Sequence, residues 1–445
     1  MNNLEKIFAQ KETENGDVAY TTTGSNLLDL FFMTEYFEKH IEEVKIGKTI
    51  KDQLFSMFIR DGRFGLGRRD LGRELMKQSG VSPQCVVAAG RFDDLYQNPT
   101  AENIEFLREQ VFKGNDLAKK WCPRLNSKDR KIAKELAKKW FFGARNIAEA
   151  EKLYRKLIKS DTVENKLSRH RIDEVEFEKV PSLAMLKYYA RFMKEERFQK
   201  YIEAVKSGEK KLNISTTTVY DIYRNRDKID ADLFFDKLEK IKINCVPILD
   251  TSGSMWDGND SIGKAISIAH YLGKCSTYCP NQVVSFSSQP RLITIDPNFP
   301  AEKRTSYYSV PYQFGGQNKY CRELSSLYTG DCSNTNFGKV MQLFSNLKEA
   351  PEYLVVLSDM EFDEGSSMSK DRTMKLFKDN GFKTKIVWWN FNARNKTVPE
   401  TDDYGNIYLS GYSPYLLKFL DAGFDGHKFL DKLLLEYKKE VFKED

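Results

Sequence analysis

The spacing of apolar residues divides the chain into two regions. From Ser25 to about Lys240, apolar positions recur every three or four residues, as expected for helices with one buried face. Ile132, Leu136 and Trp140 follow this spacing, while lysines occupy another side of the same predicted helix. There is no long strand signal and no strict repeat in this region, so the pattern predicts an irregular array of paired helices.

From Ile241 onward, short continuous apolar runs alternate with helical stretches. Continuous apolar runs are typical of strands that are buried on both faces, and their alternation with helices favours a doubly wound, mostly parallel sheet. Residues 300–334 lack this order, and we interpret them as an insertion or a long loop near the functional site. The expected strands are residues 243–249, 283–286, 292–295, 353–357, 385–389 and 407–409, and the expected helices are 261–278, 337–348, 369–379 and 427–441.

These changes of pattern place the domain boundaries. Residues 1–23 are predicted to be a polar N-terminal lead-in, residues 24–240 a helical domain, and residues 241–445 an α/β domain. The predicted fold class is therefore an all-helical region followed by a doubly wound α/β domain.

Composition limits the class and the location of the protein. Of the 445 residues, 40% are hydrophobic and 30% are charged, as in ordinary soluble proteins. No apolar run approaches the roughly 18–20 residues that cross a bilayer, and the polar N-terminus does not look like a targeting signal. The cysteines are odd in number and scattered, which indicates reduced thiols. We expect a cytoplasmic protein, or a virion protein if a virus encodes it, with no membrane partner.

The net charge of +6 is unevenly distributed. The basic excess lies in the first half of the chain, and within residues 111–160 basic residues clearly outnumber acidic ones. A local excess of positive charge attracts phosphate groups. The alternative is an ordinary solvated helix surface.

Oxygen-bearing side chains follow three of the predicted elements. The turn Asp250-Thr251-Ser252-Gly253-Ser254 comes directly after the first strand, and Gly253 permits a tight turn there. A second loop offers the hydroxyl of Thr335 before a helix, and a third offers Asp359 after a strand. In open α/β sheets, sites form where loops leave the carboxyl ends of the strands. Taken alone, the turn at Asp250 is equally typical of a helix cap.

The spacing D-x-S-x-S, followed by a distant Thr and then an Asp, resembles the metal-ion-dependent adhesion site of von Willebrand A domains. This resemblance implies direct ligation of a divalent cation by Ser252, Ser254 and Thr335. Asp250 and Asp359 would act mainly through bound waters, and one coordination position would stay open for a carboxylate of a partner. Hard oxygen ligands suit Mg²⁺, which is the expected ion, with Mn²⁺ and Ca²⁺ as alternatives.

Further motifs occur in a characteristic order along the chain. They include Leu153-Tyr154-Arg155-Lys156-Leu157, Val180-Pro181-Ser182, Ser358-Asp359-Met360-Glu361-Phe362-Asp363, Trp389-Asn390 and Ser410-Gly411-Tyr412-Ser413. This order resembles the uncharacterised domain-of-unknown-function 2828 family, whose members contain a von Willebrand A domain and are related to the Ro (TROVE) proteins. The resemblance covers roughly residues 50–430.

Ro proteins combine HEAT-like helical repeats with a von Willebrand A domain and bind small structured or single-stranded RNAs. The resemblance therefore implies a HEAT-like helical domain, a von Willebrand A domain with a metal site, and a ribonucleoprotein function. The implied RNA contacts form two basic clusters. They are Arg60, Arg63, Arg68 and Arg69 in the first cluster, and Lys131, Lys134, Lys138, Lys139, Arg145, Arg155 and Lys156 in the second.

No enzyme motif stands out. The four histidines lie near no Ser or Cys in a recognisable nucleophile motif, so a hydrolytic triad is not expected. A Zn²⁺ site formed by Cys275, Cys279, Cys321 and Cys332 is an alternative, although C-x₂-C spacing is absent. The leading hypothesis is a non-enzymatic RNA-binding protein. The alternative is a protein-interaction or virion scaffold that captures a partner carboxylate at the metal; a metal-assisted nuclease is a third possibility with little support.

Overall fold

The computed structural model describes residues 3–256, 259–300, 318–328, 330–400, 405–412, 414–417 and 426–443. The chain divides into two compact units. The sheet unit contains Met1–Val44 and Met185–Leu435, and the helical unit contains Lys45–Ala184 and Glu436–Asp445. The boundaries predicted at residues 23/24 and 240/241 follow changes of sequence pattern rather than spatial contacts, and they stay a prediction.

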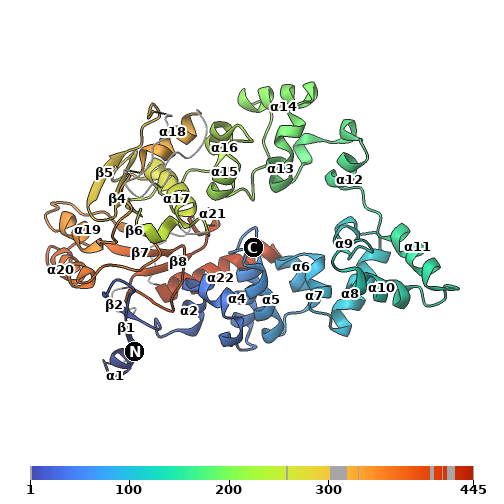
Figure 1. Cartoon of the computed structure of the whole chain (residues 1–445), viewed down its shortest axis with the longest axis horizontal. Coiled ribbons are helices and arrows are strands. Elements are labelled where there is room, and N and C mark those ends of the chain that lie inside the picture. Colours follow the sequence, from blue (N-terminus) through green and yellow to red (C-terminus); the bar gives the residue numbers. More distant parts are fainter. Residues whose placement is uncertain are drawn as a thin grey trace. The chain divides into compact units, whose positions relative to one another are not determined.

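A six-stranded sheet forms the core of the sheet unit (Figure 1). Its order is β5-β4-β3-β6-β7-β8, and all neighbours are parallel except β4 and β5, which form an antiparallel pair. The central strands β3 and β6 are buried at every position, which explains their continuous apolar sequence. The strands are β3 (Cys245–Asp250), β4 (Gln282–Phe286), β5 (Pro290–Thr294), β6 (Tyr353–Ser358), β7 (Lys385–Asn390) and β8 (Ile407–Ser410).

Helices follow the strands in alternation, as the pattern predicted, so the doubly wound, mostly parallel architecture is confirmed. The helix α17 packs on β3 and β4, and α19 packs on α20. The expected irregular segment 300–334 contains the unpredicted helix α18, while residues 301–317 and 329 lie outside the described part of the chain. These helices are α17 (Ser261–Cys275), α18 (Lys319–Ser326), α19 (Phe337–Phe344), α20 (Ser366–Asp379), α21 (Pro414–Leu417) and α22 (Gly426–Phe442), with the 3-10 turn η4 (Gly253–Trp256).

Both tryptophans at the end of β7 are core residues. Trp388 and Trp389 are almost fully buried, and their indole N–H groups donate to Glu400 Oε1 and to the carbonyl of Gly411, each at 2.7 Å. This burial leaves neither ring a free face for stacking on a nucleotide base.

Residues 3–43 belong to the sheet unit and include two short strands and several helices. The strands β1 and β2 form an antiparallel pair, and the helix α2 packs against β8. A buried ion pair of 3.1 Å joins Glu35 to Lys264 of α17. The elements are α1 (Asn3–Ala9), β1 (Gln10–Glu12), β2 (Val18–Tyr20), α2 (Asn26–Phe32), α3 (Thr34–Lys39) and η1 (Ile41–Glu43).

The helical unit is built from short helices that follow one another directly along the chain (Figure 1). Side-chain caps define several starts: Thr49 and Asp52 form a capping box, and Asn146 accepts from the amide of Glu149. Gly72 allows α5 to approach the backbone of Arg60 on α4, because a Cβ atom at position 72 would lie only 2.6 Å from the Cα of Arg60.

The helices of this unit are α4 (Ile50–Arg60), α5 (Arg69–Ser79), α6 (Pro83–Ala89), α7 (Phe92–Gln97), α8 (Ala101–Phe112), α9 (Asp116–Trp121), α10 (Arg130–Trp140), α11 (Ile147–Leu157) and α12 (Val163–Ser168), with η2 (Ile172–Glu174) and η3 (Phe177–Lys179). The helix α13 (Ser182–Phe192) leads back to the sheet unit, which also contains α14 (Glu196–Lys206), α15 (Val219–Asn225) and α16 (Ala231–Lys237). None of the described helices is both long and apolar enough to cross a bilayer.

Candidate functional site

The two aspartates of the predicted metal site lie at the same edge of the sheet. Asp250 is the last residue of β3, and Asp359 directly follows the last residue of β6. These strands are parallel neighbours, with Leu249 opposite Leu357. Because carboxyl ends of parallel strands meet at one edge, the fold brings together two side chains that are far apart in sequence.

Asp250 is fully buried and held by two hydrogen bonds. Its Oδ1 accepts from the amide of Ser252 at 2.8 Å, and its Oδ2 accepts from the hydroxyl of Ser358 at 2.5 Å. Burial raises the pKa of the Asp250 carboxyl well above its usual value, and the nearby charge of Asp359 raises it further. A positive charge at this site would relieve both effects.

Asp359 has one oxygen in contact with a cationic side chain and one without a partner. Oδ2 lies 3.2 Å from Nη2 of Arg394, whereas Oδ1 is buried and accepts no hydrogen bond from any described residue. Burial raises the pKa of the Asp359 carboxyl; the Ser254 hydroxyl and Arg394 lower it, and Glu361 raises it. A buried carboxylate oxygen without a donor is unusual and calls for a ligand.

Two of the predicted hydroxyl ligands, Ser252 and Ser254, lie on the loop after β3, and the third, Thr335, lies on the loop before α19. Ser252 and Thr335 are buried, and the hydroxyls of Ser252 and Ser254 lie 3.3 Å apart. The loop that bears Thr335 is fixed by Asp363, whose Oδ1 accepts from the amide of Thr335 at 3.1 Å and whose own amide donates to the Thr335 carbonyl at 3.0 Å. Asp363 therefore connects the loop that follows β6 to the loop that bears Thr335.

This donor set fits a divalent cation that prefers oxygen. Two buried carboxyls with raised pKa values, the unpartnered Oδ1 of Asp359 and a pair of facing hydroxyls are what such an ion would compensate. Within the described ranges, no three His, Cys, Asp or Glu side chains gather as a metal site, so the four cysteines do not form a Zn²⁺ centre and hydroxyls must contribute to any site here.

A segment that sequence reasoning treated as a lead-in contacts the loop after Asp359. The Thr13 hydroxyl donates to the carbonyl of Phe362 at 2.7 Å, and the amide of Glu14 donates to Oε2 of Glu361 at 2.7 Å. The carboxylate of Asp17 accepts from the amide and hydroxyl of Ser367. The only sequence signal for this contact is the polar character of residues 12–17, which is not specific.

The second basic cluster lies on the surface of the helical unit. The side chains of Lys131, Lys138, Lys139, Arg145 and Lys156 are exposed, and none of them forms an ion pair with a described residue. Lys134 and Arg155 are also exposed, but both approach Glu151, at 3.5 and 3.6 Å. The helices α10 and α11 pack together, so they carry most of this cluster on adjoining elements.

The first basic cluster is largely engaged in internal contacts. Arg60 is buried, and its guanidinium lies 2.5 Å from Asp94. Arg63 interacts with Asp61 and with the carbonyl of Ala88, whereas Arg68 is half-buried. Of the four arginines in this first cluster, only Arg69 is exposed without an ion pair to a described residue. We therefore leave Arg60 out of any RNA surface.

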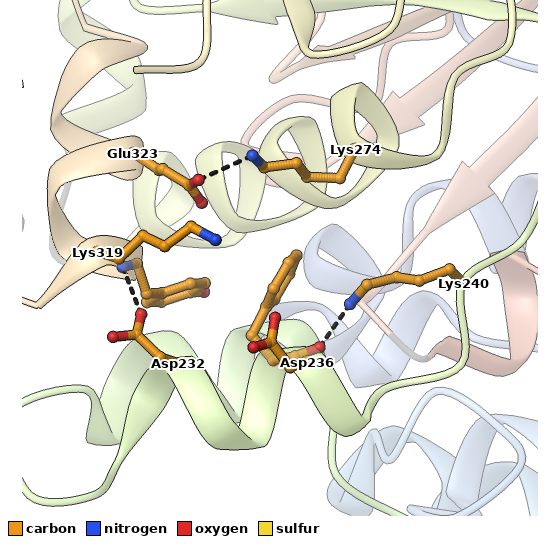
Figure 2. Close-up of a pocket in the computed structure, with 8 residues that line it drawn as sticks. Asp232, Asp236, Lys240, Lys274, Lys319 and Glu323 are labelled. Carbon is orange, nitrogen blue, oxygen red and sulfur yellow. Dashed lines mark hydrogen bonds and ion pairs between the residues drawn. The ribbon is translucent and has the colours of Figure 1, made fainter. Parts of the chain in front are cut away.

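A separate pocket of about 220 Å³ lies in the sheet unit between α16, α17 and α18 (Figure 2). Lys274 lies 2.8 Å from Oε1 of Glu323, whose Oε2 lies 2.7 Å from Nε2 of His270. Asp232 accepts from the amide of Tyr320 at 2.7 Å.

Lys240 closes the other side of this pocket. Its ammonium donates to the Phe235 carbonyl and lies 3.6 Å from the centroid of the Phe235 ring, and burial lowers the pKa of Lys240 to about 8. The rings of Phe235 and Tyr320 pack against each other and against His270. Because most of these charges and rings already have protein partners, we assign the pocket no ligand.

Comparisons with known proteins agree with part of the sequence-based interpretation. Residues 94–232 match a family model described as "Domain of unknown function (DUF2828)", and residues 323–442 match one described as "Domain of unknown function (DUF7788)". The predicted resemblance to the 2828 family is confirmed for the first of these ranges.

Two similar proteins cover most of the chain. "Uncharacterized protein L728" of Acanthamoeba polyphaga mimivirus is 22% identical, and the match covers 91% of this chain and 83% of that protein. The crystal structure of the Deinococcus radiodurans Ro (RSR) protein is 12% identical with a TM-score of 0.41, covering 83% of this chain and 87% of the other. The chain thus has one region similar to each of two domain families of unknown function and is distantly similar to a mimivirus protein.

Proposed function

We propose that this protein is a non-catalytic RNA-binding protein whose RNA surface lies on α10 and α11. The observation that carries the proposal is the group of exposed cationic side chains without acidic partners, formed by Lys131, Lys138, Lys139 and Arg145. Cations that are not neutralised within the protein are available to phosphates, and their counterions are released on binding. The motif order that resembles the Ro-related family supports the same class of ligand.

Exposed aromatic side chains accompany these cations. Phe142 is 91% exposed in the turn between α10 and α11, and Phe112, near Trp140 and Phe141, is 48% exposed. Aromatic rings beside positive charge are typical of surfaces on which unpaired bases stack. This combination favours RNA with unpaired nucleotides over a purely electrostatic, duplex-only interaction.

Charge reversal tests the RNA surface. Replacing Lys131, Lys138 and Lys139 by Glu is expected to weaken binding of a hairpin RNA with a single-stranded tail by about tenfold or more, and to reduce its salt dependence. Binding is measured by fluorescence anisotropy between about 50 and 200 mM salt.

The matched control reverses Arg372, Lys375 and Lys378, three exposed cations on α20, and changes the net charge by the same amount. Wild-type affinity is expected for this control. Equal losses in both triple variants would show that net charge alone matters, and absence of binding by the wild type would refute the proposal.

We further propose that a divalent cation, with Mg²⁺ the expected ion, binds where the loops of residues 250–254, Thr335 and Asp359 meet. We call this place the three-loop site. Ser252, Ser254 and Thr335 would contact the ion, and Asp250 and Asp359 would hold its waters and balance its charge. Such an ion, when bound, supplies a concentrated positive charge that recruits an acidic group. What supports this is the unpartnered Oδ1 of Asp359 beside two facing hydroxyls.

Titration calorimetry with Mg²⁺ and Mn²⁺ tests the cation. The Asp250→Asn variant keeps the size of the side chain but removes its charge, and we expect its binding heat to be lost or its affinity to fall by about a hundredfold. Asp379, exposed at the end of α20, serves as the control in an Asp379→Asn variant. Equal heats for wild type and Asp250→Asn would remove the metal from the proposed function.

A protein-interaction scaffold is the second candidate, because the same site would capture a partner carboxylate through the ion. Co-purification distinguishes the two candidates. The scaffold predicts that a partner protein is recovered with the chain, that EDTA releases this partner, and that no nucleic acid is bound. Recovery of RNA that salt releases, and EDTA does not, favours the first candidate.

A further inference from the structure

One arginine, Arg394, links the three-loop site to the N-terminal segment, residues 13–17. Nη2 of Arg394 lies 3.2 Å from Oδ2 of Asp359 and 2.9 Å from Oε2 of Glu14. The other carboxylate oxygen of Glu14 accepts from Asn395 at 2.9 Å. A single guanidinium nitrogen thus connects a carboxylate of the site with a residue about 345 positions earlier in the chain.

The contacts of Arg394 are incomplete. Its Nε is buried and donates to no described residue, so the guanidinium does not form the two-pronged contact that makes arginine–carboxylate pairs strong. Asp359 is equally incomplete, since its Oδ1 is without a donor. A pair that leaves both partners unsatisfied is easier to displace than a bidentate pair.

We propose that Arg394 is an internal counter-ion of the three-loop site, which a divalent cation displaces, and that this displacement releases the N-terminal segment through Glu14. This inference rests on the proposed cation site. A cation held through water at Oδ1 of Asp359 would lie near the guanidinium at Oδ2, so the two positive charges repel each other. When Arg394 leaves Asp359, Glu14 loses its ion pair and the segment is released. Because coupling between two binding events is reciprocal, the docked segment lowers the affinity of the site for the cation by the same factor.

The docked segment has several contacts that report its release. Residues 13–17 hold the loop after Asp359 through Thr13, Glu14, Asn15 and Asp17. The amide of Glu14 is one of them, because it donates to Glu361. Loss of these bonds raises amide hydrogen exchange in residues 10–20 without requiring the unit to unfold.

Two charge-removing variants are both expected to raise the affinity for the cation, although they remove charges of opposite sign. Arg394→Gln removes the competing charge, and we expect Mn²⁺ to bind on the order of tenfold more tightly. Glu14→Gln removes the ion pair that holds Arg394 and the N-terminal segment in place, so Arg394 is easier to displace and we expect Mn²⁺ to bind more tightly, by a smaller factor. The matched control is Lys396→Gln, two residues from Arg394, whose ammonium pairs with Glu43 at 3.6 Å and not with Asp359.

Hydrogen exchange supplies a readout that is independent of affinity. Saturating Mn²⁺ is expected to raise exchange in residues 10–20 of the wild type and of Lys396→Gln, whereas Arg394→Gln is expected to exchange rapidly there with or without the ion. If Mn²⁺ binds wild type and Arg394→Gln equally and leaves exchange unchanged, the counter-ion role is overturned while the cation site stands. If neither protein binds Mn²⁺, the cation site fails and this inference fails with it.

Discussion

Asp94 and Asp359 are both buried aspartates, but their surroundings compensate their charges to different degrees. Asp94 in the helical unit contacts the guanidinium groups of Arg60 and Arg73, each at 2.5 Å, and accepts from the amide of Arg91. Asp359 has one arginine at 3.2 Å and one unpartnered oxygen. At the scale of single residues, both carboxylate oxygens of Asp94 have cationic partners, although Nε of Arg60 has none, whereas Asp359 keeps one buried oxygen without a donor, which suits a ligand.

Removing the carboxylate of Asp94 tests the structural network. The Asp94→Ala change leaves the buried guanidinium of Arg60 without its partner, so we expect the free energy of unfolding to fall by about 3–5 kcal/mol. Asp70→Ala removes an exposed partner of Arg73 at 3.3 Å, and less than about 1 kcal/mol is expected. Urea unfolding measures both, and similar losses for the two variants would contradict this account.

Sequence reasoning worked well for residues whose surroundings are local and less well for arginines. Asp250, Ser252 and Ser254 follow one strand, so their convergence could be predicted from the turn itself. Arg60 was expected at an RNA surface because it belongs to a basic cluster, but it lies in the core beside Asp94. Nothing local distinguishes a buried, paired arginine from an exposed one, because the partner lies 34 residues away.

At the scale of elements, the turn between α10 and α11 places an aromatic ring among cations. The helix α10 buries Ala133, Leu136, Ala137 and Trp140 and exposes its lysines, so the amphipathic pattern of the sequence is confirmed. Phe142 interrupts that pattern, since it is apolar yet almost fully exposed. An exposed aromatic residue beside Lys139 and Arg145 has no role in packing that the structure reveals.

Phe142→Ala isolates the contribution of stacking to RNA binding. We expect the affinity for single-stranded RNA to fall by about 1–3 kcal/mol, with little change for a blunt duplex, because unpaired bases alone can stack on the ring. Phe8→Ala serves as the control, since Phe8 is 83% exposed on α1 in the sheet unit. Unchanged single-strand binding by Phe142→Ala, together with clear binding by the wild type, would exclude stacking while keeping the RNA proposal.

At the scale of the whole chain, the alternation of strands and helices after Ile241 was sufficient to predict a mostly parallel sheet. The strands expected at residues 243–249 and 353–357 correspond to β3 and β6, but the alternation does not give the order of the strands, so the pairing of these two strands, which brings Asp250 and Asp359 to one edge, comes from the structure. The docking of residues 13–17 was beyond prediction, because short polar segments carry no periodic signal and their partners are remote in sequence.

The distance along the chain between Thr13 and Phe362 has a consequence for biosynthesis. These residues are 349 positions apart, so at about 5–20 residues per second the ribosome needs roughly 17–70 s after making the first to deliver the second. During that interval residues 13–17 have none of their loop partners and are open to proteases and chaperones. The loop after Asp359 therefore gains its N-terminal contacts late, and an affinity tag attached at Met1 would lie about a dozen residues along the chain from Thr13.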